Sequence, residues 1–200
     1  MDIKLIFEDL KKDLQSINER ANERLLKEEQ VRSSIYCSLK NQGYIVAAER
    51  NFEKNSEIEC DLVFWKNSGP ESWMEIKTAR YSNLKRDIRR LDKNGKDSWN
   101  NNPRGQAQSW KKDIEKLKKI KNKELPKYFI LVEQCHAESI FEILMKDKKS
   151  EIKDYFEGMN HEKIMFELKW NKAPVDKCIV RIFDLKKLQL KRTELKNKSF

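Results

Sequence analysis

Apolar residues recur three and four positions apart between Ile3 and Ala21, and this spacing predicts an α-helix. The helix is expected to run on to about Gln42, because no glycine or proline occurs before Gly43. One interpretation is a helix that lies on the domain; the alternative is a self-associating arm, since the stripe has a heptad spacing. The same stripe later includes Glu28, and an acidic side chain at a core-facing position requires a partner.

Alternating apolar residues then predict three strands in succession. They are expected at 44–48, 58–65 and 73–78, and the turn signals at 67–70 join the last two strands as a hairpin. Residues 81–104 look irregular, with turn signals at Asn94-Gly95 and again before Pro103. We interpret this segment as a long functional loop.

A helix over 106–121 and an apolar strand over 128–133 complete the order helix, three strands, helix, strand. A helix near 138–156, strands near 164–170 and 178–183 and a lysine-rich tail are expected after them. The length of 200 residues suits one domain. We therefore predict an N-terminal helix at 1–24, a core at 25–135 and a C-terminal α/β extension of the same domain at 136–200.

The balance of charged residues favours a polyanionic partner. Lysine and arginine number 43 against 33 aspartates and glutamates, which gives a net charge of +10. Nucleic acid is the first expectation, and an anionic membrane surface is the second. Apolar runs fall well short of the roughly 20 residues that span a bilayer. The start of the chain lacks the apolar region of a signal peptide, so a soluble, cytoplasmic protein without a membrane partner is expected.

The cysteines are scattered and form no C-x-x-C pair, and the only histidines are His136 and His161. A structural zinc site is therefore not expected. We expect reduced, buried thiols at Cys37, Cys60, Cys135 and Cys178.

Charged residues of two predicted strands converge on one face. Strand alternation places Glu75 and Lys77 on one face of the third strand, and Met74 and Ile76 on the other. The hairpin then puts Asp61 opposite Glu75 or Lys77. Two neighbouring carboxylates repel unless a proton or a cation lies between them, and oxygen ligands suit Mg²⁺ or Mn²⁺. Such a cation neutralises charge that grows on a phosphate, while the lysine can orient the attacking water.

The Glu-x-Lys pattern alone is not specific, because it also begins at Glu151, Glu167 and Glu194. Only the copy at Glu75 has an upstream acid that a hairpin brings alongside. The alternative for this copy is a solvent-facing salt bridge across two strands. Apolar runs in the neighbouring strands favour burial on both faces, where bare charges are costly.

This order of elements and motifs resembles the core of the PD-(D/E)XK nucleases, over about residues 25–134. The superfamily includes most type II restriction enzymes, Holliday junction resolvases and many repair nucleases. The resemblance implies a restriction endonuclease-like α/β fold, with an αβββαβ core and a mixed sheet. It also implies that Asp61 and Glu75 bind the metal and that Lys77 assists the attacking water. Cys60 stands where many members have a proline before the aspartate.

The resemblance adds accessory residues from two helices. Glu28, with Glu29 as its rival, would match the metal-binding acid that some members carry on a helix. Gln106 and Gln108 open the helix after the motif, where several families place a glutamine; the alternative is ordinary helix surface. The basic loop is the expected nucleic-acid contact, with a merely solvated loop as the alternative. Its contact residues would be Lys85, Arg86, Arg89, Arg90, Trp99 and Arg104.

The expected function is that of a Mg²⁺- or Mn²⁺-dependent endodeoxyribonuclease of the restriction, defence or repair type, with RNA as the alternative substrate. Two alternatives belong to other classes. One is a non-catalytic nucleic-acid-binding module on the same fold, and the other is a coiled-coil interaction protein organised by the first helix. Because cutting both strands of a duplex commonly requires two active sites, we also consider a homodimer through that helix.

Overall fold

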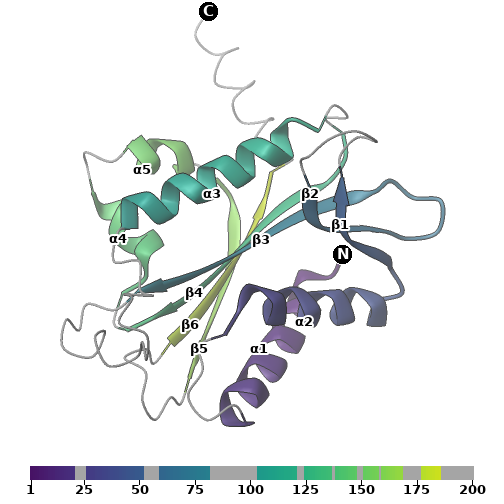
Figure 1. The fold of residues 1–200 in the computed structure, drawn as a ribbon, viewed down its shortest axis with the longest axis horizontal. Helices are drawn as coiled ribbons and strands as arrows, with labels where there is room; N and C mark the ends of the chain where they lie inside the picture. Colours follow the sequence, from purple (N-terminus) through teal and green to yellow (C-terminus); the bar gives the residue numbers. More distant parts are fainter. Residues whose placement is uncertain are drawn as a thin grey trace, which may run out of the picture.

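Six strands form one mixed sheet, in the order β1-β2-β3-β4-β6-β5 (Figure 1). This computed structural model describes residues 1–20, 26–51, 59–81, 103–120, 124–136, 138–147, 151–157, 159–168 and 177–185. The strands are β1 Ile45–Asn51, β2 Glu59–Trp65, β3 Ser72–Tyr81, β4 Lys127–Cys135, β5 His161–Glu167 and β6 Lys177–Asp184. The helices of the described part are α1 Ile3–Arg20, α2 Glu28–Asn41, α3 Pro103–Lys118, α4 Ile140–Lys146 and α5 Glu151–Phe156.

The sheet is mixed because one of its connections is a helical crossover. β1, β2 and β3 pair antiparallel as a meander, whereas β3 and β4 pair in parallel and are connected through α3. β6 then pairs antiparallel with β4, and β5 pairs antiparallel with β6. The prediction of an α/β fold with a mixed sheet is confirmed.

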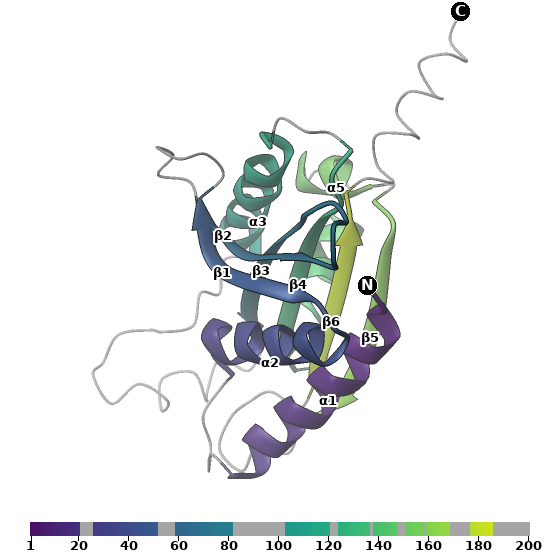
Figure 2. The ribbon, with the colours of Figure 1, turned by 90° about the vertical axis from the view of Figure 1, so that its right-hand side faces the viewer.

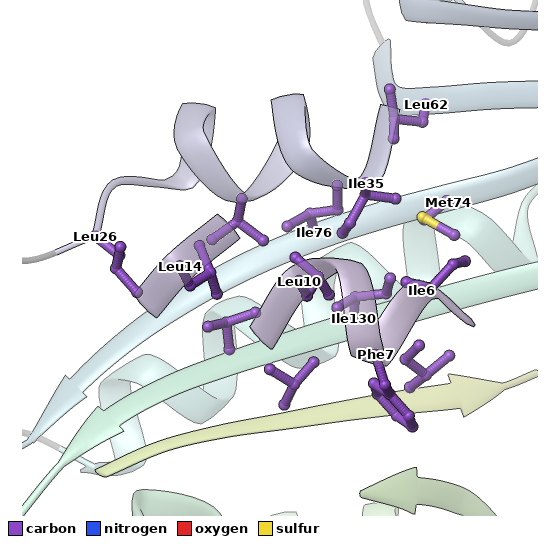
Figure 3. Close-up of a cluster of buried hydrophobic side chains, with 14 of the residues drawn as sticks. Ile6, Phe7, Leu10, Leu14, Leu26, Ile35, Leu62, Met74, Ile76 and Ile130 are labelled. Carbon is purple, nitrogen blue, oxygen red and sulfur yellow. The ribbon is translucent and has the colours of Figure 1, made fainter. Parts of the chain in front are cut away.

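Helices cover both faces of the sheet (Figure 2). α1 and α2 lie on one face, where Phe7, Leu10 and Leu14 of α1 pack with Ile76 and Ile130 of the central strands (Figure 3). α3, α4 and α5 lie on the other face, and their apolar side chains pack against the opposite sides of the same strands. The central strands are therefore covered on both faces, as their continuous apolar runs predict.

The prediction of one helix from Ile3 to about Gln42 is wrong, because two helices, α1 and α2, occupy this part. α2 has a start of its own. Lys27 has an extended backbone, and its N–H donates to the side chain of Gln30 at 2.8 Å. Heptad spacing does not distinguish one long helix from two helices that use the same apolar stripe against one core.

The apolar stripe of α1 is buried within this chain. Ile6, Leu10 and Leu14 have no exposed surface, and Phe7 is 6% exposed. These are the side chains that a self-associating arm would offer to a second copy. The arm and the homodimer stay untested, but the stripe invoked for them already covers the sheet.

Two further expectations are corrected. The helix expected near 138–156 is divided into α4 and α5, because Asp147 has an extended backbone at the end of α4. All four cysteines are free, yet Cys37 is exposed rather than buried, since it lines an open groove between α1 and α2. None of the helices in the described part is long and apolar enough to span a membrane.

Candidate active site

Strand β3 presents the predicted charges to the face covered by α3. Met74 and Ile76 belong to the core beneath α1 and α2, whereas Glu75 and Lys77 contact residues of α3. The β2–β3 register pairs Leu62 with Met74, so continuing it by one residue places Asp61 opposite Glu75. The Ile76 N–H donates to Asp61 Oδ2 at 2.7 Å, which fixes this carboxylate beside β3.

Glu75 is a buried carboxylate that has one cationic partner among the described residues. Lys116 of α3 donates from Nζ to Glu75 Oε1 at 2.5 Å. The other oxygen, Oε2, is buried and accepts no hydrogen bond within the described part of the chain. Burial and the neighbouring Asp61 raise the pKa of Glu75 to about 7, although Lys116 opposes the shift. A carboxylate in these surroundings is stabilised by positive charge.

The Lys77 ammonium lies between two carboxylates from different helices. Its Nζ is 3.5 Å from Glu28 Oε1 on α2 and 3.6 Å from Asp113 Oδ2 on α3. Burial lowers the pKa of Lys77, but Asp113 and Glu28 outweigh burial, and the pKa lies above its ordinary value. Burial also raises the pKa of Asp113, against the effect of Lys77 and Lys116. Lys77 is therefore held as an ammonium ion.

Glu28 reaches the site from the first turn of α2. Its Oε2 accepts a hydrogen bond from the Thr78 N–H of β3 at 3.2 Å. Leu26, two residues before α2 begins, is anchored by the side chain of Gln134 at the end of β4. That side chain accepts from the Leu26 N–H at 2.8 Å and donates to the Leu26 carbonyl at 2.9 Å. Glu29, the rival of Glu28, is exposed and lines a groove between α1 and α2.

Arg32 of α2 is a cationic neighbour of Asp61. Its guanidinium lies 3.6 Å from Asp61 Oδ1 and 2.8 Å from Glu49 of β1. Glu49 has a positive φ of 52°. This conformation is uncommon for residues other than glycine and interrupts the regular strand beside the site.

Sequence reasoning missed three residues of this cluster, Arg32, Asp113 and Lys116. Asp113 and Lys116 directly precede the buried Ile114 and Leu117, so helical periodicity could have placed both on a flank of the buried side. Gln106 lies on the same flank as Asp113, two turns earlier. Gln108 is exposed.

Most of the predicted nucleic-acid contacts cannot be placed. Lys85, Arg86, Arg89, Arg90 and Trp99 lie outside the described residues. Arg104 belongs to the first turn of α3, but its side chain is not described. The loop prediction therefore stays a prediction.

The carboxylate oxygens of this site are of the chemical type that binds a hard divalent cation. Within the described residues, no three His, Cys, Asp or Glu side chains are gathered into a group that could hold a metal ion. Asp61 and Glu75 nevertheless lie on paired strands, and Glu75 Oε2 and Asp113 Oδ2 are buried oxygens without a hydrogen bond in that same part. Carboxylate oxygens are the ligands that Mg²⁺ and Mn²⁺ prefer.

Comparisons of this chain with protein-family models, with curated proteins and with solved structures give no match.

Proposed function

We propose that the chain is a divalent-metal-dependent nuclease that hydrolyses DNA phosphodiester bonds, on a restriction endonuclease-like core of the PD-(D/E)XK type. One observation carries the proposal: Asp61 and Glu75 lie on paired strands, with Lys77 two residues after Glu75 on the same face. The order α2, β1, β2, β3, α3, β4, with β3 parallel to β4, supports the core assignment.

The residues of the site divide into two tasks. Asp61 and Glu75 would hold the Mg²⁺ or Mn²⁺ ion, with Glu28 as the acid from a helix. When bound, the ion would lower the pKa of water and neutralise charge on the phosphate. Lys77 is an ammonium ion, so its part is to orient water and stabilise negative charge rather than to take up a proton.

The Lys77 ammonium group forms ion pairs with Glu28 of α2 and with Asp113 of α3. Their carboxylates restrict the ammonium group to one place at the end of the site. A group held in position before the reaction loses little freedom when the reaction begins, and this preorganisation supports catalysis. Asp113 is thus a positioning residue in this proposal.

The alternative is a non-catalytic nucleic-acid-binding module on the same fold. The ion pairs of Glu75 with Lys116 and of Lys77 with Glu28 favour it, because the charges already compensate one another without a metal. The coiled-coil alternative requires an apolar stripe that is buried in this chain's own core.

Cleavage of labelled plasmid and linear DNA with Mg²⁺, Mn²⁺ or EDTA tests the proposal. Asp61→Asn removes a ligand charge, so cleavage and the thermal stabilisation by Mn²⁺ are both expected to disappear. Lys77→Ala is expected to reduce hydrolysis by orders of magnitude while the Mn²⁺ stabilisation remains.

Glu167→Ala is the matched control, because Glu167 begins another Glu-x-Lys pattern but is exposed on the edge strand β5. It is expected to cut like the unchanged protein, as is Lys169→Ala. Normal cleavage by the Asp61 and Lys77 variants would refute the assigned site. Binding of DNA without any metal-dependent cleavage would favour the non-catalytic module.

A further inference from the structure

The sides of helix α3 face different parts of the protein. Its apolar side, which includes Trp110 and Ile114, is buried against the sheet and the neighbouring helices. A second side faces α5, where the ammonium groups of Lys111 and Lys118 lie 5.2 and 4.6 Å from the ring centroid of Tyr155. Lys112 is exposed and lies on neither of these sides.

The acidic residues of α3 are both engaged elsewhere. Asp113 lies toward the site, 3.6 Å from Lys77. Glu115 accepts hydrogen bonds from Tyr155 Oη at 2.6 Å and from Lys118 Nζ at 3.0 Å. Neither carboxylate is therefore available to neutralise the outer side of the helix.

Three lysines follow one another at spacings of four and three residues, and we call them the outer lysine row: Lys112 and Lys116 of α3, and Lys119 directly after the helix ends. Their spacings of four and three residues place them on one side of a helix, and the Lys119 N–H still donates to the Glu115 carbonyl at 3.2 Å. Lys112 and Lys119 are exposed, and neither has an ion pair in the described part of the chain. Lys116, between them, reaches Glu75.

The length of this outer lysine row suits a nucleic-acid strand. At about 1.5 Å of rise per residue the row extends over roughly 10 Å, and one strand of B-DNA carries a charge about every 3.4 Å along its axis. The row therefore spans about three successive phosphates. Its middle lysine contacts a carboxylate of the candidate active site, so a strand bound along the row passes that site.

We propose that the outer lysine row of α3 is a binding surface for the phosphate backbone of duplex DNA. The inference rests on the proposed function for its link to cleavage, but the binding itself does not require catalysis. Phosphate contacts position a duplex and carry no sequence information, so the row contributes affinity that is the same for different DNA sequences. The exposed ammonium groups of Lys112 and Lys119, which have no ion pair in the described part of the chain, fit such a partner by charge.

Fluorescence anisotropy with a fluorescein-labelled 20-base-pair duplex, in EDTA and at several salt concentrations, tests the surface. The double variant Lys112→Gln with Lys119→Gln is expected to bind at least about tenfold more weakly, and the slope of log Kd against log salt is expected to fall by about 2. In cleavage assays the loss is expected in KM. The control, Lys111→Gln with Lys118→Gln, removes the same charge on the side facing Tyr155 and is expected to bind like the unchanged protein.

Equal affinities of the two double variants for the duplex would overturn the proposal, and so would tight binding of duplex RNA without binding of DNA. The two proposals fail separately. If the unchanged protein binds DNA through the row but never cuts it with Mg²⁺ or Mn²⁺, the nuclease proposal fails and the row stands. If the unchanged protein cuts DNA and the Lys112→Gln, Lys119→Gln variant keeps its KM, the lysine row is not the binding surface, and the nuclease proposal stands.

Discussion

Glu75 is the residue at which burial and charge oppose each other most directly. It lies 4% exposed in the middle of a sheet, beside a second carboxylate and against one lysine. Its pKa of about 7 lies above the usual 4.5. Between about pH 4.5 and 7, Glu75 of the folded, metal-free protein therefore keeps a proton that the same side chain has already released in the unfolded chain.

The first prediction is a pH dependence of stability that belongs to this residue. In EDTA, the free energy of unfolding should fall as the pH rises from about 4.5 to about 7, by at most about 1.4 kcal/mol per pH unit, because the ionised form is disfavoured in the fold. Urea denaturation at pH values on both sides of this window measures it. Glu75→Gln should remove this component, and an unchanged pH dependence in that variant would assign the titration to another group.

The second prediction concerns Lys116, whose ammonium group occupies the vicinity of Glu75 where a cation would bind. Lys116→Met removes this competitor and leaves Glu75 uncompensated, so the affinity for Mn²⁺ should rise about tenfold or more. Isothermal titration calorimetry measures the change. Lys119→Met alters the net charge equally on the same side of the helix and should leave the affinity nearly unchanged; weaker Mn²⁺ binding by the Lys116 variant would contradict the competition.

Local pattern brought the strand residues of the site together in prediction, but it missed Arg32 of α2 and Asp113 and Lys116 of α3. Asp61, Glu75 and Lys77 come together through the alternation of β3 and the hairpin register, which depend on neighbouring sequence. Asp113 and Lys116 contact them across a crossover of more than 30 residues. Such contacts depend on how α3 is rotated against the sheet, and no short pattern determines that rotation.

Among the elements, α1 departs most from what its sequence suggests. Its apolar spacing is the same for a coiled-coil seam and for a helix packed on a sheet, so spacing alone cannot distinguish the two. In the structure the stripe packs with Val132 and Val180 of the central strands. The element is thus part of the core that positions Glu28 and β3.

The third prediction tests this role of α1. Leu10→Ala should lower the free energy of unfolding by about 2 to 5 kcal/mol, because it opens a cavity in a fully buried position. Leu5→Ala on the same helix is the control, since Leu5 is 37% exposed and its loss should cost far less. Denaturant unfolding gives both values. Unchanged stability of the Leu10 variant, together with dissociation of a dimer in sedimentation, would instead make the stripe an interface between two copies.

For the whole molecule, the important question is whether the C-terminal extension belongs to the same folding unit as the candidate site. β6 pairs with β4 from Lys177 to Asp184, and β4 also pairs with β3, which carries Glu75. A buried ion pair joins Arg181 of β6 to Glu133 of β4. Arg181 also donates to Ser139 at the start of α4, so β4 of the core shares one set of polar contacts with β6 and α4 of the extension.

The fourth prediction follows from this connection. Glu133→Gln keeps an acceptor for the Phe141 N–H but removes the buried carboxylate beside Arg181, and among the described residues only the more exposed Glu142, at 3.1 Å, still pairs with the guanidinium. The free energy of unfolding should therefore fall by up to about 3 to 5 kcal/mol. Adding Arg181→Met removes the buried charge that has lost its buried partner and should recover much of that loss, since a buried pair is often replaceable by uncharged residues.

Hydrogen exchange shows whether that loss is shared by the whole sheet. In one cooperative unit, amides of β2 and β3 beside the site should lose as much protection in Glu133→Gln as amides of β5 and β6 do, although they lie strands apart. Loss of protection confined to β5 and β6 would make the extension a separate unit. A shared loss would mean that β5 and β6 stabilise the position of Asp61 and Glu75, because the register of β2 and β3 would then persist only while the whole sheet remains folded.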